Sequence, residues 1–362
     1  MNSNTKVLMA MSGGIDSSVA AMLLREQGYQ VIGITMKTWD FSSNNYSSRK
    51  ETGCCSLDSI NDAREVAVKY GFPHYVLDFR NEFNELIVNN FIEEYLAGHT
   101  PNPCVRCNTF IKWDALLKKA DLLGCDFIAT GHYVKIRHEN SRYIISKGKD
   151  DSKDQSYVLW GLTQENLKRT LFPLGNYLKS DIREIARKNG FDNLAKKRES
   201  YEICFIPDNN YRCFLENNIQ NFKEKYPEGV LKLIDGKILG THKGYPNYTI
   251  GQRKGLEVAV GYPIYVVDID PVTNTVTLGK KDDLLKQELF VKDFNPVKFT
   301  TFTEPLEVLT KIRYKDKGTY SSIEQYNNQI KVTFFNKVSA ITPGQSAVFY
   351  DGDDVVGGGV IV

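Results

Sequence analysis

The sequence has 362 residues, of which 41% are hydrophobic and 25% charged, and its 46 Lys and Arg against 44 Asp and Glu give a net charge of +2. This composition excludes a disordered chain, and the small net charge means that any basic surface for a nucleic acid must be local. The length predicts two or three domains rather than one core. No apolar run is long enough to span a bilayer and the first residues contain no secretory segment, so we expect a cytoplasmic protein without membrane contact.

The first loop of the chain predicts a nucleotide site. An apolar strand pattern over 7–10 and a helical stripe over 19–24 enclose Ser12-Gly13-Gly14-Ile15-Asp16-Ser17-Ser18. The glycines let the backbone approach a ligand closely, the serines add hydroxyl donors, and the helix start offers unpaired N–H groups to an anion. A Walker A loop would end with a lysine, which is absent here, so the loop suggests cleavage between the first and second phosphates, with Asp16 as a tentative ligand of Mg²⁺.

The pattern then alternates between strands and helices. Strands are predicted at 31–36, 74–78 and 127–130, and helices at 62–69, around 83–91 and around 111–117. This alternation predicts an α/β fold with a parallel sheet covered by helices on both faces. The edge of such a sheet at which its strands end would hold both the glycine loop and Gly131-His132.

Beyond about residue 210 the pattern becomes short strands. Hairpins are predicted at 231–239 and 265–278, and strands at 306–314, 329–335, 347–350 and 355–362, which favour a small β-barrel. We therefore expect three domains: 1–210, a central β-rich domain at 211–283, and a C-terminal β-barrel at 284–362. Alternation over 306–314 predicts two strand faces. One would carry Leu306, Val308, Ile312 and Tyr314, and the other Glu307, Lys311 and Arg313, free to meet a phosphate or simply solvated.

The cysteines are the second feature of the sequence that indicates a functional site. In an intracellular protein, seven cysteines favour reactive or metal-binding thiols over a disulfide framework. Two prolines stiffen the approach to Cys104-Val105-Arg106-Cys107, just before a predicted helix, so a helix N-terminus and Arg106 should lower the pKa of the Cys107 thiol. Half of a zinc site is the alternative, but the remaining cysteines do not supply a well-spaced second pair. Cys204, between apolar residues, would by itself be interpreted as a buried core thiol.

Several motifs together resemble one family. The 12–18 loop resembles the PP-loop of ATP pyrophosphatases, the adenine nucleotide α-hydrolase-like enzymes that activate substrates by adenylation. With 99–108, 153–157, the Cys204 segment and 248–256, the chain resembles the bacterial tRNA-specific 2-thiouridylase family from Lys6 to near its C-terminus. The resemblance implies that ATP adenylates the C2 oxygen of the wobble uridine of tRNA. Sulfur from a cysteine persulfide then replaces this oxygen, with release of AMP and pyrophosphate.

The resemblance also implies roles for individual residues. Cys107 would be the nucleophile and Cys204 the persulfide carrier, a pair able to form a disulfide. The target base would lie against Asn102, Pro103 and Cys104. The implied partners are tRNA, ATP with Mg²⁺, and an upstream persulfide donor, either a cysteine desulfurase or a sulfur-relay protein. The implied ATP contacts are Ala10, Met11, Ser12, Gly13, Gly14, Ile15, Asp16, Ser17, Met36 and Gly131, and the implied tRNA contacts are His132, Lys153, Asp154, Gln155, Arg313, Tyr314 and Gln345.

One departure from the family leaves the sulfur chemistry open. Some members carry an aspartate, to which an acid/base role is assigned, where this chain has Cys104. A thiol with a pKa of about 8.5 could still shuttle a proton. Alternatively, Cys104, Cys107 and Cys204 could hold a four-iron four-sulfur cluster with one open iron for sulfide, although we favour the persulfide route. Another adenylating PP-loop synthetase and a non-catalytic RNA-binding module with a relic loop are the further alternatives.

Overall fold

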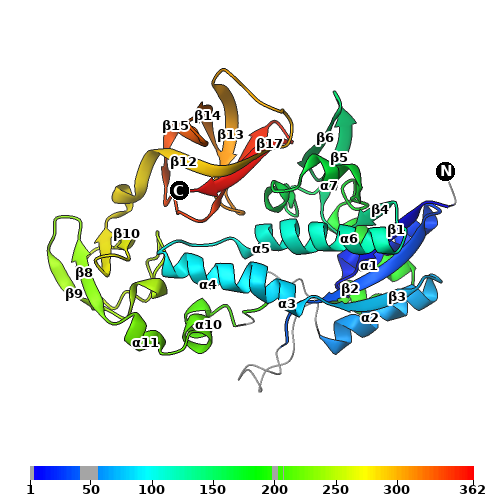
Figure 1. Cartoon of the computed structure of the whole chain (residues 1–362), viewed down its shortest axis with the longest axis horizontal. Helices are drawn as coiled ribbons and strands as arrows, with labels where there is room; N and C mark the ends of the chain where they lie inside the picture. The colour runs from blue at the N-terminus through cyan, green and yellow to red at the C-terminus, as the bar shows by residue number, and fades with distance from the viewer. Residues whose placement is uncertain (1–3, 41–55, 198–202, 207) are drawn as a thin grey trace.

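The computed structural model describes residues 4–40, 56–197, 203–206 and 208–362 (Figure 1). Cys54, Cys55 and the stretch 199–202 before Cys204 lie outside these residues. The N-terminal part contains the predicted parallel sheet, in the order β3-β2-β1-β4-β7. Its strands are β1 (Lys6–Ala10), β2 (Gln30–Lys37), β3 (His74–Asp78), β4 (Phe127–Ala129) and β7 (Thr170–Leu171).

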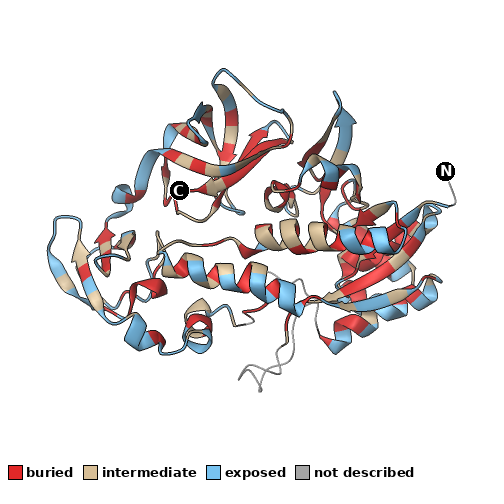
Figure 2. Cartoon of the chain, viewed as in Figure 1, coloured by how far each residue is buried: buried red, intermediate tan, exposed pale blue. Residues whose placement is uncertain are grey.

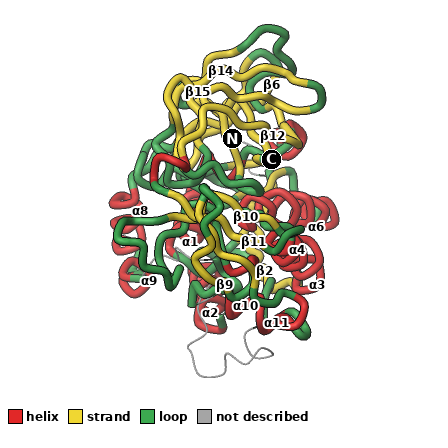
Figure 3. Tube along the Cα trace, turned by 90° about the vertical axis from the view of Figure 1, so that its left-hand side faces the viewer, coloured by secondary structure: helices red, strands yellow, loops and turns green. Residues whose placement is uncertain are grey.

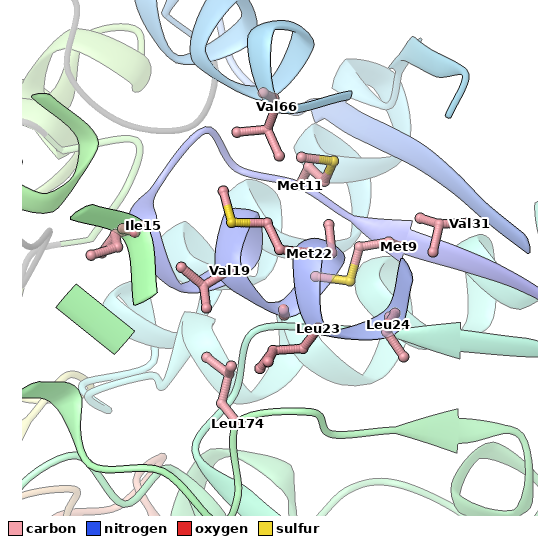
Figure 4. Close-up of a cluster of buried hydrophobic side chains, with 14 of the residues drawn as sticks. Met9, Met11, Ile15, Val19, Met22, Leu23, Leu24, Val31, Val66 and Leu174 are labelled. Atoms are coloured by element: carbon pink, nitrogen blue, oxygen red, sulfur yellow. The ribbon is translucent and has the colours of Figure 1, made fainter. Parts of the chain in front are cut away.

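Helices cover both faces of this sheet, because successive residues of its strands point to opposite sides. Val7 and Met9 of β1 face one cluster, which includes Val66, and Leu8 faces a second one, with Trp113. Figure 4 shows the first cluster around Met9, Met22 and Val66. This face carries α1 (Ile15–Glu26), α2 (Leu57–Lys69), α8 (Lys179–Lys188) and α9 (Asp192–Lys196); the other carries α5 (Pro103–Arg106), the π-helix η2 (Cys107–Ala115), α6 (Leu116–Leu122), the 3₁₀ helix η3 (Ser156–Leu159) and α7 (Gln164–Lys168).

A third group of helices extends the molecule away from the sheet. Its aromatic cluster contains Trp39, Phe83, Phe91, Phe205 and Phe214, with ring centroids of Phe91 and Phe205 5.3 Å apart. Figure 2 shows α4 and α6 striped with buried and exposed residues, as expected for helices that bury one face. The helices are α3 (Arg80–Phe83), the π-helix η1 (Asn84–Val88), α4 (Asn89–Leu96), α10 (Tyr211–Asn218) and α11 (Phe222–Lys225).

The central and C-terminal parts are built of strands, as predicted. A four-stranded sheet, in the order β10-β11-β8-β9, contains both predicted hairpins. Six strands form a barrel that pairing between β12 and β17 closes, and Figure 3 shows these strands gathered at the top of the view, above most of the helices. The strands and short helices are β8 (Gly229–Leu233), β9 (Ile238–His242), η4 (Tyr245–Asn247), β10 (Tyr265–Asp270), β11 (Thr275–Gly279), η5 (Lys281–Leu284), β12 (Leu285–Pro296), β13 (Leu306–Lys311), β14 (Thr319–Tyr326), β15 (Gln329–Ser339), β16 (Ser346–Asp351) and β17 (Asp354–Ile361).

A hairpin that the sequence did not predict joins the N-terminal part of the chain to the C-terminal barrel. Strands β5 (Val134–Glu139) and β6 (Arg142–Lys147) pair antiparallel with each other, and β6 meets β17 where Ser146 pairs with Asp354. The hairpin therefore extends the barrel sheet, although it lies within residues 1–210. The domain limits at 210 and 283 stay predictions.

Two details of the predicted elements were wrong. Helix α2 begins at Leu57, five residues before the predicted start at Asp62. Strand β13 ends at Lys311, so Arg313 and Tyr314 lie in the following turn rather than on opposite faces of the strand, and Tyr314 is 42% exposed. No helix in the described part of the chain is long and apolar enough to cross a membrane.

Candidate active site

The 12–18 loop is folded tightly at the carboxyl end of β1. The Ser17 hydroxyl accepts the backbone N–H of Ser12 at 3.1 Å and donates to the Gly14 carbonyl at 3.2 Å. Gly13 has a φ of +67°, and a Cβ on it would lie 1.9 Å from the carbonyl oxygen of Ser59 in α2. Gly14 is the N-cap of α1 and has no side chain to cap the helix, so the first N–H groups of α1 are left for a ligand.

The predicted ATP contacts converge at this edge of the sheet. The N–H of Met11 donates to the Ile34 carbonyl at 2.7 Å, and the Thr35 hydroxyl donates to the Met11 carbonyl at 2.8 Å. Because Ala10 pairs with Ile34, Met36 lies just beyond the end of β1 on the neighbouring strand. Gly131, after β4, approaches the loop so closely that a Cβ on it would lie 2.7 Å from the Ser17 nitrogen. The structure thus brings the two glycine positions together at the carboxyl ends of the parallel strands, where the sequence pattern placed both of them.

A lysine that sequence reasoning missed reaches the loop from α8. The Lys179 ammonium lies 2.6 and 2.7 Å from the two carboxylate oxygens of Asp16, and the Tyr133 hydroxyl donates to the same carboxylate at 2.6 Å. The Lys179 side chain is only 10% exposed. The loop motif itself lacks a lysine, but the fold supplies one from 163 residues away. Only its place as the first residue of an amphipathic helix could have drawn attention to it.

Asp16 is therefore poorly suited to hold a metal ion by itself. Its carboxylate already binds an ammonium and a hydroxyl, and the described part of the chain contains no group of three or more His, Cys, Asp or Glu able to hold a metal ion. Mg²⁺ is usually bound through one or two carboxylates together with substrate phosphates and water. These residues do not form a protein cage for Mg²⁺, and its binding with ATP stays a prediction.

A second lysine ties the loop to its surroundings. The Lys197 ammonium donates to the Gly13 carbonyl at 3.0 Å and to the Ser59 hydroxyl at 3.2 Å, and pairs with Asp62 at 2.6 Å. Three segments distant in the sequence thus meet at one ammonium. The conformation of the loop consequently depends on α2 and on the chain after α9.

The cysteine helix begins earlier than predicted. Asn102 caps α5 by accepting the Val105 N–H at 3.3 Å, and Pro103 is the first helical residue. Cys104 therefore lies in the first turn, closer than Cys107 to the positive end of the helix dipole. The Arg106 guanidinium donates to the Leu86 carbonyl at 3.2 Å and lies over the Phe110 ring, and its expected effect on the pKa of Cys107 stays a prediction.

Cys104, Lys112 and His132 form an electrostatically coupled group. Cys104 is accessible to solvent, but the surrounding protein raises the pKa of its thiol, and the Lys112 ammonium partly offsets this rise. Burial, together with Lys112, lowers the pKa of His132 well below its ordinary value, so this imidazole is neutral at pH 7. His132 is 8% exposed, hydrogen-bonds to the Thr130 hydroxyl at 2.8 Å and packs beside Trp113. Its predicted contact with tRNA stays untested.

The segments that carry Cys107 and Cys204 meet at the aromatic cluster. Cys107 and Ile203 both pack against it, and Phe205, next to Cys204, is one of its central rings. Cys204 itself is exposed, contrary to its interpretation as a buried thiol from local sequence alone. The cluster thus holds an accessible cysteine close to the helix that carries the other two.

The predicted RNA contacts fall at the junction with the barrel. The Tyr314 hydroxyl donates to the Asp154 carbonyl at 3.1 Å, and the Gln155 side chain accepts the Tyr133 N–H at 3.0 Å. Lys153 lies half-buried in the same loop, and one nitrogen of the exposed Arg313 donates to the Ser339 carbonyl at 2.9 Å. Gln345 contacts the chain itself, as described below. The structure brings these positions together, whereas their contacts with RNA stay predictions.

Comparison with known proteins places the whole chain in one family. The tRNA-specific 2-thiouridylase MnmA of Amoebophilus asiaticus (strain 5a2) is 57% identical over 98% of this chain and 95% of its own length. Its counterparts in Cytophaga hutchinsonii and Salinibacter ruber are 54% and 52% identical, each over 100% of this chain and 98% and 95% of their own lengths. The chain belongs to the tRNA-specific 2-thiouridylase family.

Family models divide this thiouridylase-family chain into three matched regions. Residues 5–208 match the tRNA methyl transferase HUP domain, 214–280 the tRNA methyl transferase PRC-barrel domain, and 286–361 the Aminomethyltransferase beta-barrel domain. The architecture of the family, a parallel-sheet domain followed by two β-rich regions, is the one predicted.

Proposed function

We propose that this protein adenylates the C2 oxygen of the wobble uridine in tRNA and replaces that oxygen with sulfur from a persulfide on Cys204. The full-length match to proteins named tRNA-specific 2-thiouridylase carries the proposal. The geometry agrees with it, because the phosphate loop, Gly131-His132 and the cysteine helix all belong to the same α/β domain.

In the first step, the uridine C2 oxygen attacks the α-phosphorus of ATP and pyrophosphate leaves. The uncapped N–H groups of α1 would bind the phosphates, and the Lys179 ammonium, held in place by Asp16, would stabilise the charge that develops on pyrophosphate. A fixed cation at this position acts as the missing loop lysine would. The residues proposed to bind ATP are those at the carboxyl edge of the sheet described above.

In the second step, sulfur replaces the activated oxygen. The Cys107 thiolate attacks the inner sulfur of the Cys204 persulfide, a disulfide forms between the two cysteines, and hydrosulfide leaves. Hydrosulfide attacks C2, and the C2 oxygen departs as part of AMP. An external thiol must then reduce the disulfide before the next turnover. The target base would lie against Asn102, Pro103 and Cys104, and the Cys104 thiol would be placed to donate or accept a proton.

The three cysteines as arranged do not favour the iron–sulfur alternative. Cys104, Cys107 and Cys204 belong to no group, within the part of the chain that is described, that is compact enough to hold a metal ion. We therefore derive no step through a cluster.

The partners we propose are tRNA and a persulfide-donating desulfurase or relay protein, in the cytoplasm.

One experiment tests the reaction and its main rival. The protein is incubated with unmodified tRNA, ATP, Mg²⁺ and a persulfide donor, and the tRNA nucleosides are analysed by mass spectrometry. We expect 2-thiouridine at the wobble position and tRNA-dependent pyrophosphate release. Pyrophosphate release that needs a small carboxylic acid instead of tRNA would favour an amidotransferase-type synthetase, and absence of ATP binding would favour a non-catalytic RNA-binding module.

A further inference from the structure

A loop of the barrel forms hydrogen bonds with the segment that leads into the cysteine helix. The side-chain nitrogen of Gln345 donates to the carbonyl oxygens of Thr100 at 2.9 Å and Pro101 at 3.0 Å. The Thr100 N–H donates to the Pro343 carbonyl at 2.9 Å. Gly344 has a φ of +87°, and a Cβ on it would lie 3.0 Å from Thr100, so only glycine allows this close approach.

The loop 343–345, which makes these contacts, is itself fixed in the barrel. The Gly344 N–H donates to the Ile361 carbonyl at 2.9 Å, and the Ile361 N–H donates to the Gln345 carbonyl at 2.8 Å. The next residue, Ser346, accepts the hydroxyl of the buried Tyr157 at 2.8 Å. The Tyr157 hydroxyl also lies beside the side chain of Asn102, the cap of the cysteine helix. Two adjacent residues of the barrel, Gln345 directly and Ser346 through Tyr157, therefore connect it to residues 100–102.

The backbone of the proline-rich segment has few hydrogen-bond donors of its own. Pro101 and Pro103 lack N–H groups, so the segment cannot form a regular backbone ladder. Both hydrogens of the Gln345 amide are already used on its two carbonyls. Loss of this amide would leave both carbonyls without these donors even in the absence of RNA.

We propose that Gln345 is a positioning residue, through which the C-terminal barrel fixes the target-base segment 102–104 relative to the nucleotide loop. This inference rests on the proposed function and extends it. It gives the barrel a part in the chemical step, separate from any contribution to RNA binding. A displacement of about 1 Å in such a segment can cost about a hundredfold in rate.

The test compares Gln345→Met, which keeps the side-chain length but has no donor, with Gln345→Ala. Gln325→Ala, at an exposed position of β14, is the matched control. Hydrogen exchange is measured on peptides covering 97–106, tRNA affinity by filter binding, and thiolation in single turnovers with saturating tRNA. We expect both Gln345 variants to exchange faster at 97–106, to react at least about tenfold more slowly, and to bind tRNA within about twofold of the unmodified protein.

Two results would overturn the inference. If tRNA affinity falls while the rate at saturating tRNA is unchanged, Gln345 is an RNA contact rather than a positioning residue. If exchange at 97–106 matches that of Gln325→Ala, the barrel does not hold the segment. The exchange measurement needs no catalysis, so failure of the unmodified protein to thiolate tRNA would count against the proposed function alone. Circular dichroism identifies any unfolded variant, and the other Gln345 variant then decides.

Discussion

The ion pair between Asp16 and Lys179 joins the first loop of the chain to a helix 163 residues later. The Lys179 side chain is only 10% exposed, and its ammonium is held by a carboxylate that the Tyr133 hydroxyl holds in turn, so the charge is fixed before any ligand arrives. Such preorganised charge stabilises a developing anion without reorganisation during the reaction.

Lys179→Met should therefore slow pyrophosphate release by about a hundredfold while leaving tRNA affinity unchanged. Pyrophosphate release is measured with a coupled assay and tRNA affinity by filter binding. Lys188→Met is the matched control, because Lys188 lies on the same helix, is 72% exposed and pairs with Glu184 on the surface. Equal rates of pyrophosphate release for the two variants would show that Lys179 has no role in the nucleotide site.

Serine substitutions at the three cysteines should have different effects on the reaction if a persulfide carries the sulfur. Cys204→Ser should adenylate tRNA but carry no transferable sulfur, Cys107→Ser should stop turnover with the persulfide intact on Cys204, and Cys104→Ser should only slow the reaction. Persulfide is measured by mass spectrometry of the intact protein, with Cys213→Ser as the control. An iron–sulfur route would be supported instead by two results together. The first three variants would all lose activity completely, and the metal-free unmodified protein would regain activity only after reconstitution of a cluster.

The thiol of Cys104 should respond to the charge of Lys112. The surrounding protein raises the pKa of the Cys104 thiol and the Lys112 ammonium lowers it, so removal of this ammonium must raise the pKa further. Lys112→Met should shift the pH profile of Cys104 alkylation toward higher pH, whereas Lys112→Arg should keep it nearly unchanged. The profile is measured by mass spectrometry of alkylated peptides between pH 6 and 10 (roughly the range that brackets a thiol pKa). Coincident profiles for Lys112→Met and the unmodified protein would show that the two groups do not interact.

At the scale of the elements, Gly13 determines how the loop docks on α2. Gly13→Ala should abolish ATP binding and lower the free energy of unfolding by about 1–3 kcal/mol, because the new methyl group would overlap the Ser59 carbonyl. Binding is measured by calorimetry and stability by urea unfolding. Gly28→Ala isolates the effect of backbone strain, since Gly28 has a φ of +89° but no atom within 4 Å of its Cβ position. Similar ATP affinities for the two variants would contradict the docking role.

The sequence predicted elements whose signals are local. The parallel strands, the hairpin around Asp235-Gly236 and the phosphate loop all follow from short patterns, and all are present. The start of the cysteine helix was missed because Asn102-Pro103 was interpreted as a stiff approach rather than as a cap followed by proline in the first turn. The hairpin of β5 and β6 was missed although its strands and its turn at Asn140-Ser141 are local, and only its pairing with β17, about 200 residues later, has no local signal. Lys179 and Gln345 act through contacts that no local pattern contains.

At the scale of the whole molecule, Asp354 connects the first domain to the barrel. Its carboxylate accepts Arg137 at 2.6 and 2.8 Å, Ser146 at 2.7 Å and Lys298 at 2.7 Å. These donors hold the pKa of Asp354 well below its usual range, Arg137 contributing most. Because its pKa is lower in the folded than in the unfolded protein, Asp354 stabilises the fold above the unfolded pKa of about 3.9 and loses this effect as the pH falls through the folded value.

Asp354→Asn should lower the free energy of unfolding at pH 7 by roughly 2 kcal/mol. The difference from the unmodified protein should shrink in strongly acidic solution. Thermal unfolding followed by circular dichroism at pH 7 and near pH 3, roughly one unit below the unfolded pKa, provides the measurement. Asp353→Asn should have little effect, because Asp353 is 74% exposed and pairs with Lys147 at 3.4 Å. A difference for Asp354→Asn that does not depend on pH would show that lost packing, rather than lost charge, is responsible.

The pairing of β6 with β17 has a consequence for synthesis of the protein. Strand β6 leaves the ribosome some 200 residues before its partner β17 is translated, and β17 also closes the barrel against β12. During this interval the hairpin of β5 and β6 presents an unpaired strand edge, which can recruit other chains. We therefore expect the nascent polypeptide to depend on chaperones until its last strand is released, and nonsense mutations that remove β17 to produce insoluble protein even though every residue of the nucleotide loop is present.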